Sequence, residues 1–236
     1  MAHERGLRPE PDFFDLPPLL HELCALPTRQ DERAHFAHVR RFTNTLAVRY
    51  SPVGGTGQSP VRPRPSLLPG ADFPSLRRRG PAKSTPISYP DLLAALPTLK
   101  RAIVLGDSGT GKSTLLHRLA ADLAHRAAAD PAEAVPVLLT LENWLGSQLP
   151  DFVCQQAPDV GWGLAPLSNQ KRLFLLLDGW DDIPQDGLND QKKQALHELV
   201  KQLHSDTPVF VSCRTQFGHE LASWGFASLT LEPFTP

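Results

Sequence analysis

The sequence predicts an α/β fold in which a five-stranded parallel sheet carries helices on both faces. From residue 90 to residue 231, segments with helical spacing alternate with short apolar runs that have the length of strands. One apolar run leads into a glycine-rich loop and then into a helix, and two others end in polar residues. Strands separated by helices pair in parallel, because each helix carries the chain back along the sheet.

The first 84 residues differ in composition from the rest of the chain. We predict a small helical N-terminal region at residues 1–50, with helices at 18–26 and 29–50. Nine prolines interrupt residues 51–90, so we predict an extended linker without regular elements at residues 51–84. Within it, residues 77–79 are three consecutive arginines, which we interpret as a solvated charge run rather than a nucleic-acid patch.

Residues 85–236 are predicted to form the α/β domain. Its expected elements, in order, are a helix at 91–96, a strand at 101–105, a helix at 112–126, strands at 135–141 and 173–178, a helix at 189–204, a strand at 208–213, a helix at 219–223 and a strand at 227–231. The sequence leaves residues 142–172 without an assigned element.

Residues 106–114 have the spacing of a phosphate-binding loop, G-x-x-x-x-G-K-S. Small residues let the backbone bend, so that consecutive N–H groups point at phosphate oxygens at the positive end of the next helix. Lys112 is predicted to reach the β- and γ-phosphates, and the Ser113 hydroxyl to ligate Mg²⁺. The segment assigned to nucleotide binding is Gly106, Asp107, Ser108, Gly109, Thr110, Gly111, Lys112, Ser113 and Thr114.

The apolar strand at residues 173–178 runs straight into carboxylates, which is a Walker B pattern. Ligands of open α/β sheets bind at the carboxyl ends of the strands. Asp178 is therefore predicted to lie beside Mg²⁺, and Asp181 or Asp182 to orient the attacking water. The strand at 208–213 precedes Arg214, which we interpret as a sensor of the γ-phosphate; a surface arginine at a strand end is the alternative.

Together these motifs resemble the NACHT branch of the STAND signal-transduction ATPases, over roughly residues 85–236. The family's Walker B is an apolar run followed by D-G-x-D-E, and its sensor strand ends in S/T-x-R. This chain has D-G-W-D-D at 178–182 and S-C-R at 212–214. The resemblance implies a P-loop NTPase with strand order 5-1-4-3-2, ATP or ADP as the nucleotide, and Mg²⁺.

One departure from the family pattern concerns the last carboxylate. Asp182 stands where the family usually has Glu. Aspartate is one methylene shorter, which places an oriented water differently, so we expect slow hydrolysis.

Family members normally continue into a helical lid and a winged-helix domain that close over the nucleotide. The sequence stops at residue 236, just after the last predicted strand, and we interpret it as a fragment or a minimal form. We expect the chain alone to be a monomer and a weak ATPase. We also expect protein partners to bind through the N-terminal region or through the missing C-terminal domains.

Composition excludes several other classes. The 236 residues carry a formal charge of −1, with a pI near 6.8, so there is no electrostatic case for nucleic acid or an anionic membrane as an obligate partner. The three cysteines lack CxxC spacing and are predicted to be reduced thiols. No apolar run approaches the roughly 18 residues that span a bilayer, and the first residues lack a signal-peptide core. The expected location is the cytoplasm.

Three functions from different classes follow from these motifs. The first is a nucleotide-operated switch, in defence or stress signalling, in which ATP and Mg²⁺ hold one state and hydrolysis resets it. The second is an ordinary P-loop enzyme, although the chain has neither the N/T-K-x-D guanine signature nor the L-S-G-G-Q signature of transporters. The third is a nucleotide-binding scaffold with little turnover.

Overall fold

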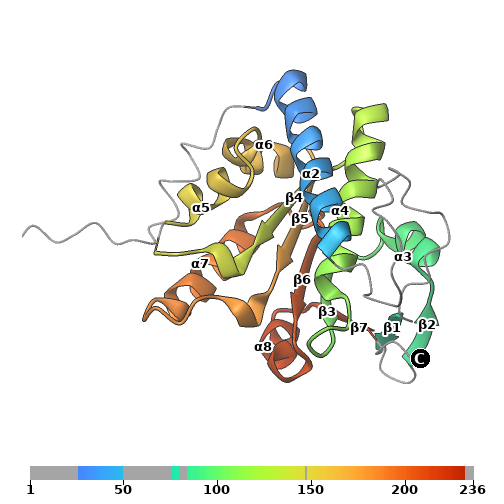
Figure 1. Cartoon of the computed structure of the whole chain (residues 1–236), viewed down its shortest axis with the longest axis vertical. Helices are drawn as coiled ribbons and strands as arrows, with labels where there is room; N and C mark the ends of the chain where they lie inside the picture. Colours follow the sequence, from blue (N-terminus) through green and yellow to red (C-terminus); the bar gives the residue numbers. More distant parts are fainter. Residues whose placement is uncertain (1–25, 50–75, 80–83, 147, 232–236) are drawn as a thin grey trace, which may run out of the picture.

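The computed structural model describes residues 26–49, 76–79, 84–146 and 148–231 (Figure 1). At its centre lies a seven-stranded sheet in the order β2-β1-β7-β3-β6-β5-β4. The strands are β1 (Leu76–Arg79), β2 (Ser84–Ile87), β3 (Arg101–Leu105), β4 (Val135–Thr140), β5 (Leu173–Asp178), β6 (Val209–Cys213) and β7 (Ala227–Leu231).

The five strands from β3 to β7 are parallel and form the predicted sheet. Numbered along the chain, their spatial order is 5-1-4-3-2, so the strand order implied by the resemblance is confirmed. Every residue of β4, β5 and β6 is buried, which explains why these strands read as continuous apolar runs. Because β6 lies between β3 and β5, the carboxyl ends of these three strands are adjacent.

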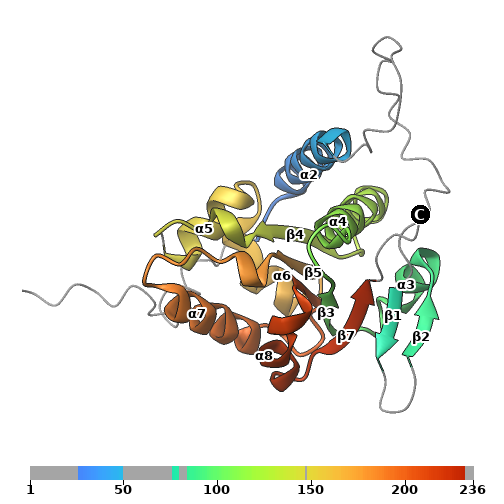
Figure 2. The ribbon, with the colours of Figure 1, turned by 60° about the horizontal axis from the view of Figure 1, so that its bottom comes forward.

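Helices cover both faces of the sheet, as predicted. They are α2 (Arg29–Arg49), α3 (Tyr89–Ala95), α4 (Lys112–Ala129), α5 (Leu149–Gln156), α6 (Leu164–Asn169), α7 (Asn189–Gln202) and α8 (Gly218–Ser223). Figure 2 shows α2 and α4 on one side of the sheet and α7 and α8 on the other. The long helix α4 packs against β4, β5 and β6, and Ser113 in its first turn contacts the last residue of β5.

The proline-rich stretch does contain regular elements, and the prediction of none was wrong there. β1 pairs antiparallel with β7, from Leu76 opposite Leu231 to Arg79 opposite Ser228, and β2 pairs antiparallel with β1. Without β1, the backbone groups along one side of β7 would have no strand to pair with. β1 contains no proline, and Pro86 lies in the edge strand β2, where a missing N–H is tolerated.

Two short helices, α5 and α6, fill the stretch that the sequence left unassigned. Each has a proline within its first three residues, Pro150 and Pro166, where no intrahelical N–H is needed. With six to eight residues each, they are too short to give a clear helical period. Tertiary packing stabilises α5 instead, since Phe152 stacks on the Trp144 ring with 5.2 Å between centroids.

The predicted N-terminal helix at residues 29–50 is α2, and it packs on α4. Phe36 and Val39 are buried in this contact. Arg172, just before β5, donates to both carboxylate oxygens of Glu32 at 2.9 and 3.1 Å. The other predicted helix, at 18–26, lies outside the described residues apart from its last one.

α2 also contacts the open edge of β4. Val135 donates its N–H to Arg172 on the β5 side, so the backbone groups of Pro136 point to the outer edge. Proline has no N–H to expose there, and its carbonyl accepts a hydrogen bond from His35 Nε2 at 2.7 Å. At this position the edge offers neither a free N–H nor a free carbonyl to another strand. The division into 1–50, 51–84 and 85–236 stays a prediction. The contacts of α2, and the pairing of β1 with β7, link residues before 85 to the α/β domain.

Candidate functional site

The glycine-rich loop, residues 106–111, joins the end of β3 to the start of α4. A side chain at position 106 would clash, because an added Cβ would lie 2.5 Å from Thr110 Oγ1. Gly109 and Gly111 have φ of +80° and +90°, in the left-handed region that favours glycine. Thr110 closes the turn by donating its hydroxyl to the Asp107 carbonyl at 2.9 Å.

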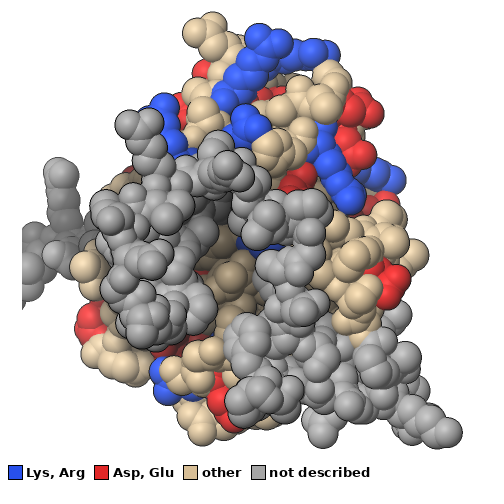
Figure 3. All heavy atoms as spheres, turned by 45° about the vertical axis from the view of Figure 1, so that its right-hand side comes forward, with Lys and Arg blue, Asp and Glu red and all other residues tan. Residues whose placement is uncertain are grey.

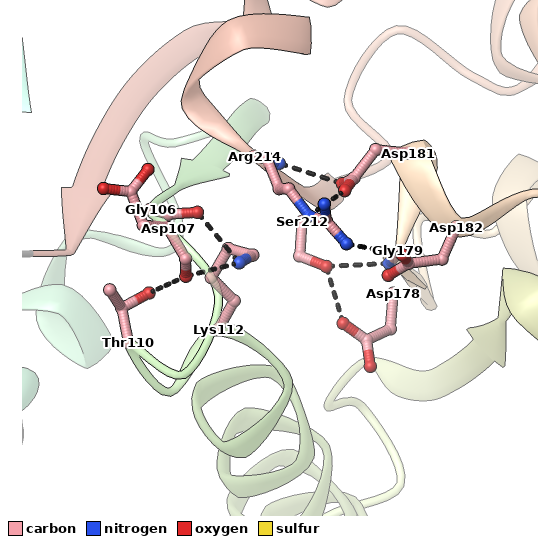
Figure 4. Close-up of polar contacts among 10 residues, drawn as sticks. All are labelled: Gly106, Asp107, Thr110, Lys112, Asp178, Gly179, Asp181, Asp182, Ser212 and Arg214. Carbon is pink, nitrogen blue, oxygen red and sulfur yellow. Dashed lines mark hydrogen bonds and ion pairs between the residues drawn. The ribbon is translucent and has the colours of Figure 1, made fainter.

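Lys112 folds back over this loop. Its ammonium donates to the carbonyls of Gly106 and Asp107 at 2.8 and 3.0 Å. In Figure 4 the side chain lies between the loop on one side and the strand-end residues on the other. A lysine in this place presents a positive charge to whatever enters between the loop and those strand ends.

Asp178, the last residue of β5, is buried and engages two hydroxyls. Its Oδ1 accepts from Ser212 Oγ at 2.5 Å and from Ser113 Oγ at 3.1 Å. Ser212 in turn accepts the backbone N–H of Gly179 at 2.8 Å (Figure 4). Ser113 comes from the first turn of α4, so the carboxylate joins the helix to two neighbouring strands.

Asp181 and Arg214 form the closest ion pair of the strand-end group. The backbone N–H of Arg214 donates to Asp181 Oδ1 at 2.9 Å, and Arg214 Nε lies 2.8 Å from Oδ2. The Asp181 side chain is 1% exposed, whereas that of Arg214 is 47% exposed. Arg214 Nη2 also donates to Asp182 Oδ1 at 3.4 Å.

Asp182 differs from Asp181 in its exposure to solvent. Its side chain is 48% exposed. Partial burial and the neighbouring Asp181 charge raise the pKa of Asp182, while Arg214 opposes the shift. Of the two carboxylates after the strand, Asp182 is the one with room to meet a ligand.

Trp180 fixes the turn that carries both carboxylates. It is fully buried, as expected for a packed aromatic at a strand end. Its indole Nε1 donates to Glu220 Oε2 of α8 at 3.2 Å, and Lys193 of α7 pairs with the same oxygen at 3.2 Å. The turn is thereby tied to the helices on one face of the sheet.

A comparison with protein families supports the interpretation of this site. The family model of the NACHT domain matches residues 100–236, which is more than half of the chain. The chain belongs to the NACHT family. NACHT domains are P-loop NTPases, so the chain contains a nucleotide-binding module. No curated protein compared with the chain matches it.

The structure of this NACHT domain brings most of the predicted site residues to one edge of the sheet. The residues that meet there are Lys112, Ser113, Asp178, Asp182 and Arg214. Asp181 is buried and pairs with Arg214. Asp107 and Ser108 are exposed on the loop, and Thr114 is exposed on the first turn of α4. Their individual roles toward a nucleotide stay predictions.

Ser212 is the first residue of the S-C-R motif noted above, but it was not among the predicted site residues. The motif is the sequence signal for this serine, and the strand register explains its contact. Leu177 pairs with Val211, so the next residues, Asp178 and Ser212, stand side by side at the strand ends.

The donor set of the NACHT site fits Mg²⁺. A serine hydroxyl and a buried carboxylate oxygen, 3.1 Å apart, are hard oxygen ligands of the kind that Mg²⁺ takes. Among the described residues, no group of three His, Cys, Asp or Glu side chains is suited to a metal. Mg²⁺ held by Ser113 and Asp178 would therefore complete its shell with water and phosphate oxygens.

Proposed function

We propose that this NACHT chain is the ATP- and Mg²⁺-binding core of a nucleotide-operated switch. The observation that carries the proposal is that Lys112, the Ser113–Asp178 pair and Arg214 converge on one edge of the sheet. A phosphate chain lying along the loop would meet the ammonium, and its terminal group would face Arg214. Cationic donors of this kind make strong, charge-assisted hydrogen bonds to phosphate.

Each residue has a distinct task in this proposal. Lys112 exchanges its two neutral carbonyl partners for β- and γ-phosphate oxygens. Ser113 and Asp178 hold Mg²⁺, which neutralises phosphate charge when bound. Asp182, exposed and with a raised pKa, orients the attacking water.

Arg214 supplies the element that responds to the nucleotide. Its side chain is half exposed and shared between two carboxylates. A γ-phosphate would compete with Asp182 for the Nη2 group, so the partners of Arg214 would differ between ATP and ADP. A switch requires such a difference in contacts between its two states.

A scaffold with little turnover is the second candidate, and one observation favours it. Asp182 hydrogen-bonds Arg214 at 3.4 Å, which occupies the carboxylate expected to orient water. With the shorter aspartate in place of glutamate, we propose that any turnover lies well below the roughly 1–10³ s⁻¹ typical of enzymes.

The wider setting of the switch is also part of the proposal. We propose a role in defence or stress signalling in the cytoplasm, with protein partners rather than nucleic acid or membrane. On the face drawn in Figure 3, basic and acidic side chains are interspersed among the described residues, which favours no single-sign binding surface. Among the described helices, none has the length and apolar character needed to cross a bilayer.

Single-turnover hydrolysis, measured together with ATP affinity, separates these functions. A switch core binds ATP with Mg²⁺ and hydrolyses it slowly, an ordinary enzyme turns over quickly, and a scaffold binds without hydrolysis. Light scattering of the same samples tests the expected monomer. Absence of ATP binding by the full chain would exclude the proposed ATP-operated switch.

A further inference from the structure

Thr140, the last residue of β4, is a buried hydroxyl beside the metal-site carboxylate. It is the register partner of Asp178, the last residue of β5. Paired residues of parallel strands place their side chains on the same face, about 4.8 Å apart. Asp178 faces Ser113 of α4, so Thr140 faces the same helix, which also packs on β4.

The Thr140 hydroxyl makes no hydrogen bond within the described part of the chain. Its Oγ1 is buried, and the residue is 9% exposed. A buried hydroxyl without a partner costs folding free energy, and such groups in a native structure usually have a partner that is absent or a functional reason. A valine of nearly the same shape would fill this place without that cost.

The surroundings of Asp178 indicate which hydrogen-bond partner the Thr140 hydroxyl lacks. Asp178 Oδ1 already accepts from Ser212 and Ser113. Ser113 Oγ and Asp178 Oδ1 lie 3.1 Å apart, close to the separation of about 2.9 Å between neighbouring ligands of octahedral Mg²⁺. Both oxygens can therefore ligate one ion once the Ser113 proton turns away, and the hydroxyl of Thr140 lies beside the carboxylate that would hold it.

We propose that Thr140 is a positioning residue of the Mg²⁺ site, with its hydroxyl hydrogen-bonding a water of the Mg²⁺ shell held by Asp178. Mg²⁺ gives up its water reluctantly and keeps several water ligands, which themselves need hydrogen-bond partners. Residues that hold such outer-shell contacts commonly change metal affinity by about 10–100-fold when they are replaced. The inference rests on the proposed function, because it places Mg²⁺ between Ser113 and Asp178.

Two substitutions test this assignment in the full chain. Thr140→Val removes the hydroxyl and keeps the shape, whereas Thr140→Ser keeps the hydroxyl. The measurements are the thermal midpoint of the nucleotide-free protein, the affinity for ATP in EDTA, and the Mg²⁺ concentration that half-saturates the metal-dependent gain in ATP binding.

For Thr140→Val we expect a thermal midpoint equal to or above that of the parent and unchanged ATP affinity in EDTA. The half-saturating Mg²⁺ concentration should rise by about 10-fold. Thr140→Ser should keep the Mg²⁺ dependence of the parent. If the Thr140 hydroxyl had only a structural role, Thr140→Val would lower the thermal midpoint.

The proposal is overturned if Thr140→Val shows the Mg²⁺ dependence of the parent, or if its thermal midpoint falls together with ATP binding in EDTA. A parent chain whose ATP binding does not depend on Mg²⁺ would overturn the proposed metal site itself, and this inference with it. The parent titration therefore distinguishes the two failures.

Discussion

Both carboxylate oxygens of Asp181 contact Arg214: Oδ1 accepts the backbone N–H at 2.9 Å, and Oδ2 forms an ion pair with Nε at 2.8 Å. The Asp181 side chain is almost fully buried and holds the backbone N–H and Nε of Arg214, whose side chain is half exposed. We infer that Asp181 positions Arg214, and that Asp182 is the carboxylate left to orient water.

Asp181→Asn should destabilise the fold, because the amide keeps one acceptor and loses the charge that faces Nε. Hydrogen bonds to charged groups contribute about 1.5–3 kcal/mol, so we expect a loss of up to about that size in the free energy of unfolding. Urea denaturation measures it. Asp190→Asn, an exposed change in the first turn of α7, is the control and should stay within about 0.5 kcal/mol of the parent. Equal effects of the two changes would mean that the pair contributes nothing to stability.

Asp178→Asn and Asp182→Asn should separate binding from turnover. Asp178 is buried against Ser113, so its change should weaken Mg²⁺-dependent ATP binding. Asp182 is exposed and hydrogen-bonds Arg214 instead of Ser113, so its change should spare ATP affinity and slow hydrolysis. Calorimetry and single-turnover assays on both variants test this. The assigned water-orienting role is wrong if Asp182→Asn lowers affinity and leaves hydrolysis unchanged.

His35 should make the stability of the chain depend on pH. Burial lowers the pKa of His35 below its usual 6.5, because the charged ring is penalised in the contact between α2 and β4. A group with a lowered pKa contributes stability that is present above pH 6.5 and is lost as the pH falls through the lowered value.

The measurement is urea denaturation at pH 7.5 and pH 5.5. His35→Gln keeps an N–H donor for the Pro136 carbonyl and does not titrate, so it should lose less stability on acidification than the parent. The same loss in both proteins would show that His35 does not titrate in this way.

Phe36 should anchor α2 to the rest of the fold. The side chain is 4% exposed, and removing a buried phenylalanine costs about 3–5 kcal/mol. Phe36→Ala should therefore lower the free energy of unfolding by an amount of that order. Arg33→Ala, an exposed change on the same helix, should stay within about 0.5 kcal/mol of the parent.

The same contacts bear on the predicted boundary at residue 84. A domain boundary at residue 84 would let residues 1–84 be removed without loss of the nucleotide-binding fold. The burial of Phe36, the Glu32–Arg172 pair and the pairing of β1 with β7 lead us to expect the opposite. A chain starting at residue 85 that is soluble and binds ATP like the full chain would support the boundary.

The parallel sheet and the loop were predictable because their signals are local. Continuous apolar runs mark strands buried on both faces, and the spacing of glycine, lysine and serine marks the loop. The pairing of β1 with β7 joins residues about 150 positions apart, and no local pattern encodes it. The roles of Ser212 and Thr140 depend on strand register, and the difference between Asp181 and Asp182 depends on which carboxylate the turn buries.

The central claim is that ATP binds at the loop through Lys112, and calorimetry of ATP with Mg²⁺ tests it most directly. Lys112→Ala is compared with Lys201→Ala, whose lysine is half exposed near the C-terminal end of α7, away from the carboxyl ends of the strands. The account predicts that the parent and Lys201→Ala bind equally, while Lys112→Ala loses at least about 1.5–3 kcal/mol of binding free energy, roughly a tenfold or greater loss in affinity. Equal ATP affinity for Lys112→Ala and the parent would contradict it.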